Sequence, residues 1–124
     1  MKKLLDTKGF TLIEVLVGLI ILAIGLLGIA GMQITSVKGN YFSNHLTQAS
    51  YVAQDRLEFL KNLPITDASL NAGSHPESAV TLSGQVFNRS YTVAVNGNLR
   101  TITYTVTWFD GANHNVSFAT IRSI

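Results

Sequence analysis

The first long stretch of the chain would be apolar on every side if it formed a helix. From Phe10 to Gly31 the only charged residue is Glu14. At about 1.5 Å per residue this stretch forms a helix about 33 Å long, which matches the hydrocarbon core of a bilayer. The pattern therefore predicts one transmembrane helix, at residues 10–32.

The next stretch is polar but still compatible with a helix. No proline occurs before Pro64, which prevents the helix from continuing. Within residues 33–63, apolar residues recur at helical spacing along one face: Ala49, Val52, Ala53, Leu57 and Leu60. The pattern predicts one continuous helix from about Phe10 to about Asn62, with an amphipathic second half that another element must cover.

After the helix, the period of the pattern changes to two. Residues 64–79 are small and polar, include Pro76, and predict a connecting loop. The clearest strand alternates threonines with Ile102, Tyr104, Val106 and Trp108. Tyr91, Val93 and Val95 form a similar face before it, and Val116 and Phe118 are the expected inward residues of the last strand. Asn96-Gly97-Asn98 and Asp110-Gly111 mark the turns.

Together these elements predict an α+β fold. We expect one long N-terminal helix and, at residues 80–124, a small antiparallel sheet of three strands, or four if residues 79–87 also pair. A sheet of this size is not stable alone, so its apolar face must pack on the amphipathic half of the helix.

Composition and charge agree with a membrane segment. Hydrophobic residues make up 47% of the 124 residues and charged residues only 13%. Lys2, Lys3 and Lys8 precede the apolar stretch, and positive flanks stay in the cytoplasm, so the N-terminus is expected inside and the C-terminal part outside. Without residues 1–9 the chain has six basic and six acidic residues, so the charge does not indicate nucleic-acid binding.

The sequence offers little for catalysis or for metal binding. There is no cysteine, and His45, His75 and His114 are too widely spaced to predict a metal site. No serine lies in a nucleophile–base arrangement, so we expect no cofactor and no enzymatic activity. Asn88-Arg89-Ser90 and Asn115-Val116-Ser117 match the glycosylation acceptor pattern, which is short enough to arise by chance.

The position of Glu14 is unusual, because a carboxylate inside a bilayer is costly. It lies four residues after Phe10, about 6 Å along the helix, where it can extend toward the cytoplasmic interface. A Gly-Phe junction after a short basic leader, followed by Thr-Leu-Ile-Glu and an apolar helix, resembles the type IV pilin family, whose prepilins share the pattern KGFTLIEVLV. The resemblance covers Lys8 to about Gly28.

This resemblance implies a processing and assembly pathway. A prepilin peptidase would cut between Gly9 and Phe10, which makes residues 1–9 a cytoplasmic leader peptide, and would methylate the new amine of Phe10. The single-pass inner-membrane precursor, with its C-terminal domain in the periplasm, would then be handled by the pilus assembly machinery. It would pack with other pilin subunits through the N-terminal helices, as part of an extracellular pilus. Glu14 would pair with the amine of Phe10 in a neighbouring subunit.

The assignment to a subtype within this family rests on a looser similarity than the assignment to the family. The segments GLIILAIGLLGIAGMQ and YVAQDRLEFLKNLP resemble minor pilins of the PilV type and I-type pseudopilins. We interpret the chain as a type IV pilus minor pilin that acts in assembly, in initiation or at an adhesive tip. The alternatives are a type II secretion pseudopilin, a single-pass periplasmic binding or sensor protein that keeps residues 1–9, and a secretory signal peptide cleaved near Ala30.

Overall fold

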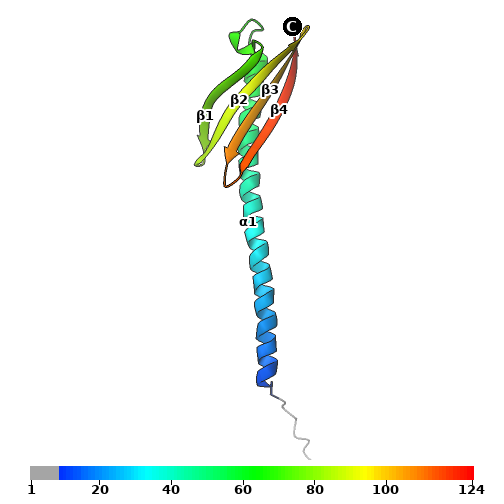
Figure 1. Cartoon of the computed structure of the whole chain (residues 1–124), viewed down its shortest axis with the longest axis vertical. Coiled ribbons are helices and arrows are strands. Elements are labelled where there is room, and N and C mark those ends of the chain that lie inside the picture. The colour runs from blue at the N-terminus through cyan, green and yellow to red at the C-terminus, as the bar shows by residue number, and fades with distance from the viewer. Residues whose placement is uncertain (1–8) are drawn as a thin grey trace, which may run out of the picture. The chain divides into compact units, whose positions relative to one another are not determined.

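The computed structural model describes residues 9–124, which form two compact units, one up to Asn40 and the other Tyr41–Ile124. Helix α1 (Leu12–Asn62) contributes to both units, and it ends near the residue that Pro64 predicts. Four strands follow in the second unit: β1 (Gly73–Leu82), β2 (Gln85–Asn96), β3 (Leu99–Phe109) and β4 (Asn113–Ser123). The α+β fold expected from the sequence is confirmed (Figure 1).

The four strands form one antiparallel sheet in chain order, a simple meander (Figure 1). The register places Phe87 of β2 opposite Trp108 of β3, and Tyr104 of β3 opposite Phe118 of β4. The two predicted turns lie where the sequence places them, between β2 and β3 and between β3 and β4. Each inward residue therefore has inward neighbours on the adjacent strands, which produces one continuous apolar face.

That apolar face is covered by one side of α1. All five residues of the predicted helical stripe are buried, and so are the four predicted inward residues of β3. Val116 and Phe118 pack against this core while remaining partly exposed. Val95 differs from the expectation, because its side chain is 47% exposed. It lies opposite Arg100 near the hairpin end of the sheet, away from the buried residues.

The expected boundary between loop and sheet is wrong. Strand β1 begins at Gly73, inside the segment 64–79 that was expected to be a loop. Pro76 suggested a loop, but β1 is an edge strand, where a residue without an N–H is tolerated. Residues 79–87 are not one strand either, because a turn divides them at Ser83 and Gly84, whose φ angles of 50° and 81° suit a tight hairpin.

The remaining connection between α1 and β1 is held by side chains from the sheet. Arg100 donates hydrogen bonds to the carbonyl oxygens of Ile65 and Leu70, at 3.1 and 2.7 Å, and Arg122 donates to the carbonyl of Leu63. The hydroxyl of Tyr91 donates to the carbonyl of Ser69 at 2.9 Å. These bonds satisfy main-chain oxygens in a segment whose one regular element is the short 3-10 helix Ala68–Leu70.

A polar cluster links the edge strand β1 to α1. The guanidinium of Arg56 donates two hydrogen bonds to the carboxylate of Glu77, at 3.1 and 2.9 Å, and the hydroxyl of Tyr104 donates to the same carboxylate at 2.8 Å. Burial is the main factor that raises the pKa of Tyr104, and the bond to Glu77 adds to the effect, so the phenol remains a donor. Two-point pairing of this kind fixes orientation as well as distance.

A second cluster links the β3–β4 turn to α1. His45 lies 3.2 Å from one oxygen of the Asp110 carboxylate, and His114 lies 2.7 Å from the other. Burial raises the pKa of Asp110, but the hydrogen bonds to His45 and His114 and the charge of His114 outweigh it, so the net pKa lies below the ordinary value. The ionised carboxylate is therefore favoured in the folded protein.

We predict that the cluster makes stability depend on pH in the acid range. A carboxyl group whose pKa is lower in the folded state stabilises the fold above its unfolded pKa of about 3.9, and this contribution is lost as the pH falls through the folded value. Asp110→Asn should lower the melting temperature at pH 7, and the difference from wild type should shrink below about pH 4. Circular dichroism melts between pH 2 and 7 measure this.

The exposed Asp55 on α1 provides the control. Asp55→Asn should change the melting temperature little at any pH, because an exposed carboxylate is well solvated in both states. Parallel pH profiles for wild type and Asp110→Asn would contradict the assignment.

Candidate processing and assembly site

The predicted cleavage junction, Gly9–Phe10, lies just before the start of α1. Both residues are exposed and outside the helix, and the side chain of Phe10 is 81% exposed. A Cβ atom added to Gly9 would meet no other atom within 4 Å among the described residues, and its φ angle is not in the left-handed range. The fold of the described part therefore does not require glycine at position 9. The rest of the predicted leader, residues 1–8, lies outside the described residues.

Helix α1 begins with a capping interaction that the sequence reasoning missed. The main-chain N–H of Glu14 donates to the hydroxyl oxygen of Thr11 at 3.2 Å, and the N–H of Val15 donates to the carbonyl of Thr11 at 3.1 Å. Thr11 thus satisfies one of the main-chain N–H groups that the first turn leaves free. The Thr-x-x-Glu pattern, which often marks a helix start, was the available signal.

The carboxylate of Glu14 lies in this first turn and is exposed. Among residues 9–124 it forms no hydrogen bond or ion pair through its side chain. Acidic residues are common in the first turn of a helix, because the main-chain N–H groups there point toward them. Within residues 9–124 the Glu14 carboxylate is therefore an unpaired acceptor at the start of an apolar surface.

The surface that follows Glu14 is almost wholly apolar. Within the described residues, α1 is the one helix apolar enough to cross a membrane, with a mean hydropathy of 2.8 over its most apolar window. Its large side chains are exposed along the whole first unit, for example Leu16, Ile20, Ile24, Leu27 and Met32. An apolar surface of this extent must be covered by lipid or by other chains.

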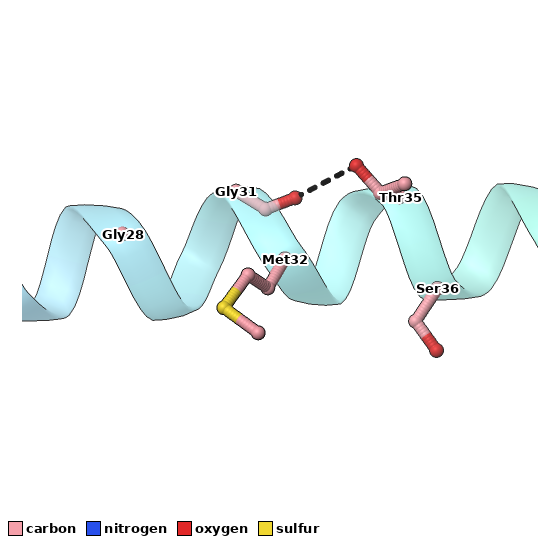
Figure 2. Close-up of a pocket in the computed structure, with 5 residues that line it drawn as sticks. All are labelled: Gly28, Gly31, Met32, Thr35 and Ser36. Carbon is pink, nitrogen blue, oxygen red and sulfur yellow. Dashed lines mark hydrogen bonds between the residues drawn. The ribbon is translucent and has the colours of Figure 1, made fainter.

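Small residues interrupt this surface. Gly28, Gly31, Met32, Thr35 and Ser36 line a shallow depression on one side of α1 (Figure 2). The hydroxyl of Thr35 donates to the carbonyl of Gly31 at 3.2 Å, and the helix continues through this position (Figure 2). Small side chains allow another helix to approach closely, so this side of α1 is suited to helix–helix packing.

The histidines are not arranged as metal ligands. Within residues 9–124 there is no group of three or more His, Cys, Asp or Glu side chains with the geometry to hold a metal ion. His45 and His114 come together, but on the carboxylate of Asp110, while His75 bonds to the carbonyl of Asn71 and stacks on Tyr91. The three histidines that are distant in the sequence thus contact other groups within the fold.

Comparison with known proteins gives one finding, at the N-terminus. Residues 5–30 match the family model of the prokaryotic N-terminal methylation motif. The chain matches no curated protein and no solved structure. The motif implies processing by a prepilin peptidase and assembly into pilus-like complexes, and it points to a structural subunit. Residues 5–30 thus identify the N-terminal part of the chain as a prokaryotic N-terminal methylation motif.

Proposed function

We propose that this chain is a minor pilin of a type IV pilus, cut between Gly9 and Phe10 and methylated on Phe10. The observation that carries the proposal is the methylation motif at residues 5–30, followed directly by a helix long and apolar enough to span a membrane. The exposed, non-helical Gly9–Phe10 junction supports it, because a protease must bind its substrate in an open conformation.

Cleavage changes the electrostatics at the start of α1. Hydrolysis of the Gly9–Phe10 bond places a new amine on Phe10, which ordinarily titrates near pH 7.7–8.0 and stays basic after methylation. In a filament core without water, the Glu14 carboxylate of one subunit would then pair with the Phe10 amine of its neighbour. A misaligned subunit would bury both charges unpaired, which costs several kcal/mol, so the pair selects the correct register.

The choice of a minor subunit rests on the second unit. The sheet is small, and the chain has no cysteine with which to form a stabilising disulfide, whereas many major pilins have such a bond. A subunit repeated along a whole filament must present complementary surfaces above and below at every step. A subunit at the tip needs only one of these surfaces, which leaves its sheet free for another role such as adhesion.

We predict that Gly9→Leu blocks processing. A bulky residue before the cut would obstruct the peptidase active site, while the open space around position 9 predicts no effect on the fold. The variant should stay at full length in the inner membrane, whereas wild-type protein should begin at methylated Phe10. Mass spectrometry of the N-terminal peptide measures cleavage and methylation together.

Gly39→Leu is the matched control, since position 39 is equally open and lies far along the chain from the junction. It should be processed normally. A single-pass binding or sensor protein would keep residues 1–9, so wild-type protein with an intact leader, in cells that have an active peptidase, would contradict the proposal.

We predict that Glu14→Gln strongly reduces entry into filaments without preventing insertion or cleavage. Glutamine has nearly the same size as glutamate and can also serve as the last residue of a capping box. It lacks the negative charge with which the Phe10 amine would pair. Recovery of the variant in sheared pili should fall at least about tenfold, the effect of about 1.4 kcal/mol of lost pairing. Immunoblots of the membrane and of sheared pili measure this.

Thr11→Ala separates the charge from the helix cap. It removes the hydroxyl that accepts the N–H of Glu14, at a cost of roughly 0.5–2 kcal/mol to the helix start, but leaves the carboxylate. It should still assemble. If Thr11→Ala fails and Glu14→Gln assembles, the importance of Glu14 lies in capping and the pairing argument is wrong.

We predict that this chain is a minor component of the filament. Deletion of its gene should reduce the number of pili or their adhesion, while another pilin remains the bulk protein of those that form. Quantitative mass spectrometry of sheared pili measures the ratio of subunits. If this chain proves the most abundant subunit, it is a major pilin. If deletion leaves pili intact and stops protein secretion, it is a type II secretion pseudopilin.

A further inference from the structure

The outer face of the sheet, opposite α1, contains a small pocket at the end nearest the β3–β4 turn. It has a volume of about 290 Å³. Residues of β2, β3 and β4 line it: Asn88, Thr107, Trp108, Phe109, Asn113, His114 and Asn115. All of these residues lie in the Tyr41–Ile124 unit. The sequence reasoning did not predict this pocket.

The register of the sheet brings the polar lining residues into one row. Asn88 lies opposite Thr107, and Thr107 lies opposite Asn115. All three side chains are exposed, and they alternate along their strands with the inward residues of the core. The two asparagines are two strand spacings apart, roughly 10 Å, with the threonine hydroxyl between them.

An aromatic ring borders this row. Phe109, two residues after Thr107 on the same face, has a side chain that is 63% exposed, and it lies opposite Asn113. Its main chain is fixed, because the amide of Gln85 donates to its carbonyl at 3.0 Å. An exposed aromatic ring beside convergent polar groups is the usual composition of a ligand site.

The amides in the pocket are free to bind a ligand. Within residues 9–124, the side chains of Asn88, Asn113 and Asn115 form no hydrogen bond with the protein. Each amide can donate and accept at the same time, and the threonine hydroxyl can do the same. The pocket can therefore match groups that are themselves both donors and acceptors, as hydroxyl groups are.

The pocket also lacks a cation for a negatively charged ligand. His114 is its one titratable lining residue, and the Nε2 atom of His114 lies 2.7 Å from the Asp110 carboxylate. His114 is therefore already engaged with a carboxylate and is not free to pair with an anionic ligand. The lining thus disfavours phosphates and acidic sugars and favours a neutral ligand.

We propose that this pocket binds a neutral sugar residue of a glycan. The hydroxyl groups of a sugar ring suit the row of amides and the threonine hydroxyl, and the C–H face of the ring suits the exposed face of Phe109. The proposal goes beyond the pilin assignment and does not depend on it, because every residue that carries it lies in the sheet.

Two of the lining asparagines, Asn88 and Asn115, also begin glycosylation acceptor patterns. A glycan attached at either position would fill the pocket covalently. The intact mass of protein purified from its native source distinguishes the two cases. We expect no added sugar on either asparagine, and an attached glycan on one of them would overturn the binding proposal.

Saturation-transfer NMR on the full chain tests binding directly. The chain is held in phosphocholine micelles, because detergents with sugar head groups would compete for the pocket. The probes are the methyl pyranosides of glucose, galactose, mannose and N-acetylglucosamine, with sialic acid as the acidic comparison. We expect transfer to the ring protons of at least one neutral sugar and none to sialic acid.

Two variants place the binding in this pocket. Phe109→Ala and Asn115→Ala, both at exposed positions, should weaken binding about tenfold, the usual effect of one lost contact or hydrogen bond. Thr103→Ala, on the same face of β3 but outside the pocket, should bind like wild type. Absence of transfer from every neutral sugar, preference for sialic acid, or equal binding by all variants would overturn the proposal and leave the processing and assembly predictions unaffected.

Discussion

The sheet depends on one contact, the apolar stripe of α1 packed against its inner face. A four-stranded meander with one apolar face is unstable while that face is exposed to water. Helix α1 is the element that buries this face. The stripe has alanines at positions 49 and 53, both with no exposed surface, so the helix can lie close to the large rings of Phe87 and Tyr104. At roughly 25 cal/mol per Å² of buried apolar surface, each large core side chain contributes about 1.5–3 kcal/mol. The Arg56–Glu77 and His45–Asp110 contacts add polar links between α1 and the sheet.

The same helix carries a second surface of a different kind. Up to about Val37 its large apolar side chains point to all sides and are exposed, whereas in the Tyr41–Ile124 unit its buried residues form one stripe. A helix that is apolar all round suits a bilayer or a bundle of like helices, and a one-sided stripe suits a sheet. The change of pattern along a single helix thus indicates that its two parts are covered by different partners.

Much of the fold was predictable from periodicity, since it depends on neighbours along the chain. The stripe from Ala49 to Leu60 and the alternation in β3 both follow from the spacing of apolar residues. Pro76 misled the prediction, because whether a proline is tolerated depends on whether its strand lies at the edge of the sheet. The Arg56–Glu77 and His45–Asp110 contacts were not predictable, since 21 and 65 residues separate the partners in the sequence.

At the candidate site, the junction and Glu14 could be found from the sequence, and the Thr-x-x-Glu pattern that contains Thr11 was present but overlooked.

The two regions for which a function is proposed are constrained in different ways. At the N-terminus the main chain of Glu14 is satisfied by Thr11, which leaves the carboxylate free, and a free carboxylate beside an apolar surface is costly unless a cation meets it. Its side chain has no hydrogen-bond or ion-pair partner within residues 9–124. The outer face of the sheet is constrained differently, because its residues alternate with the buried core residues and lie outside the core. Three unpaired amides and an exposed phenylalanine gathered at one end of such a face are therefore explained better by binding than by stability.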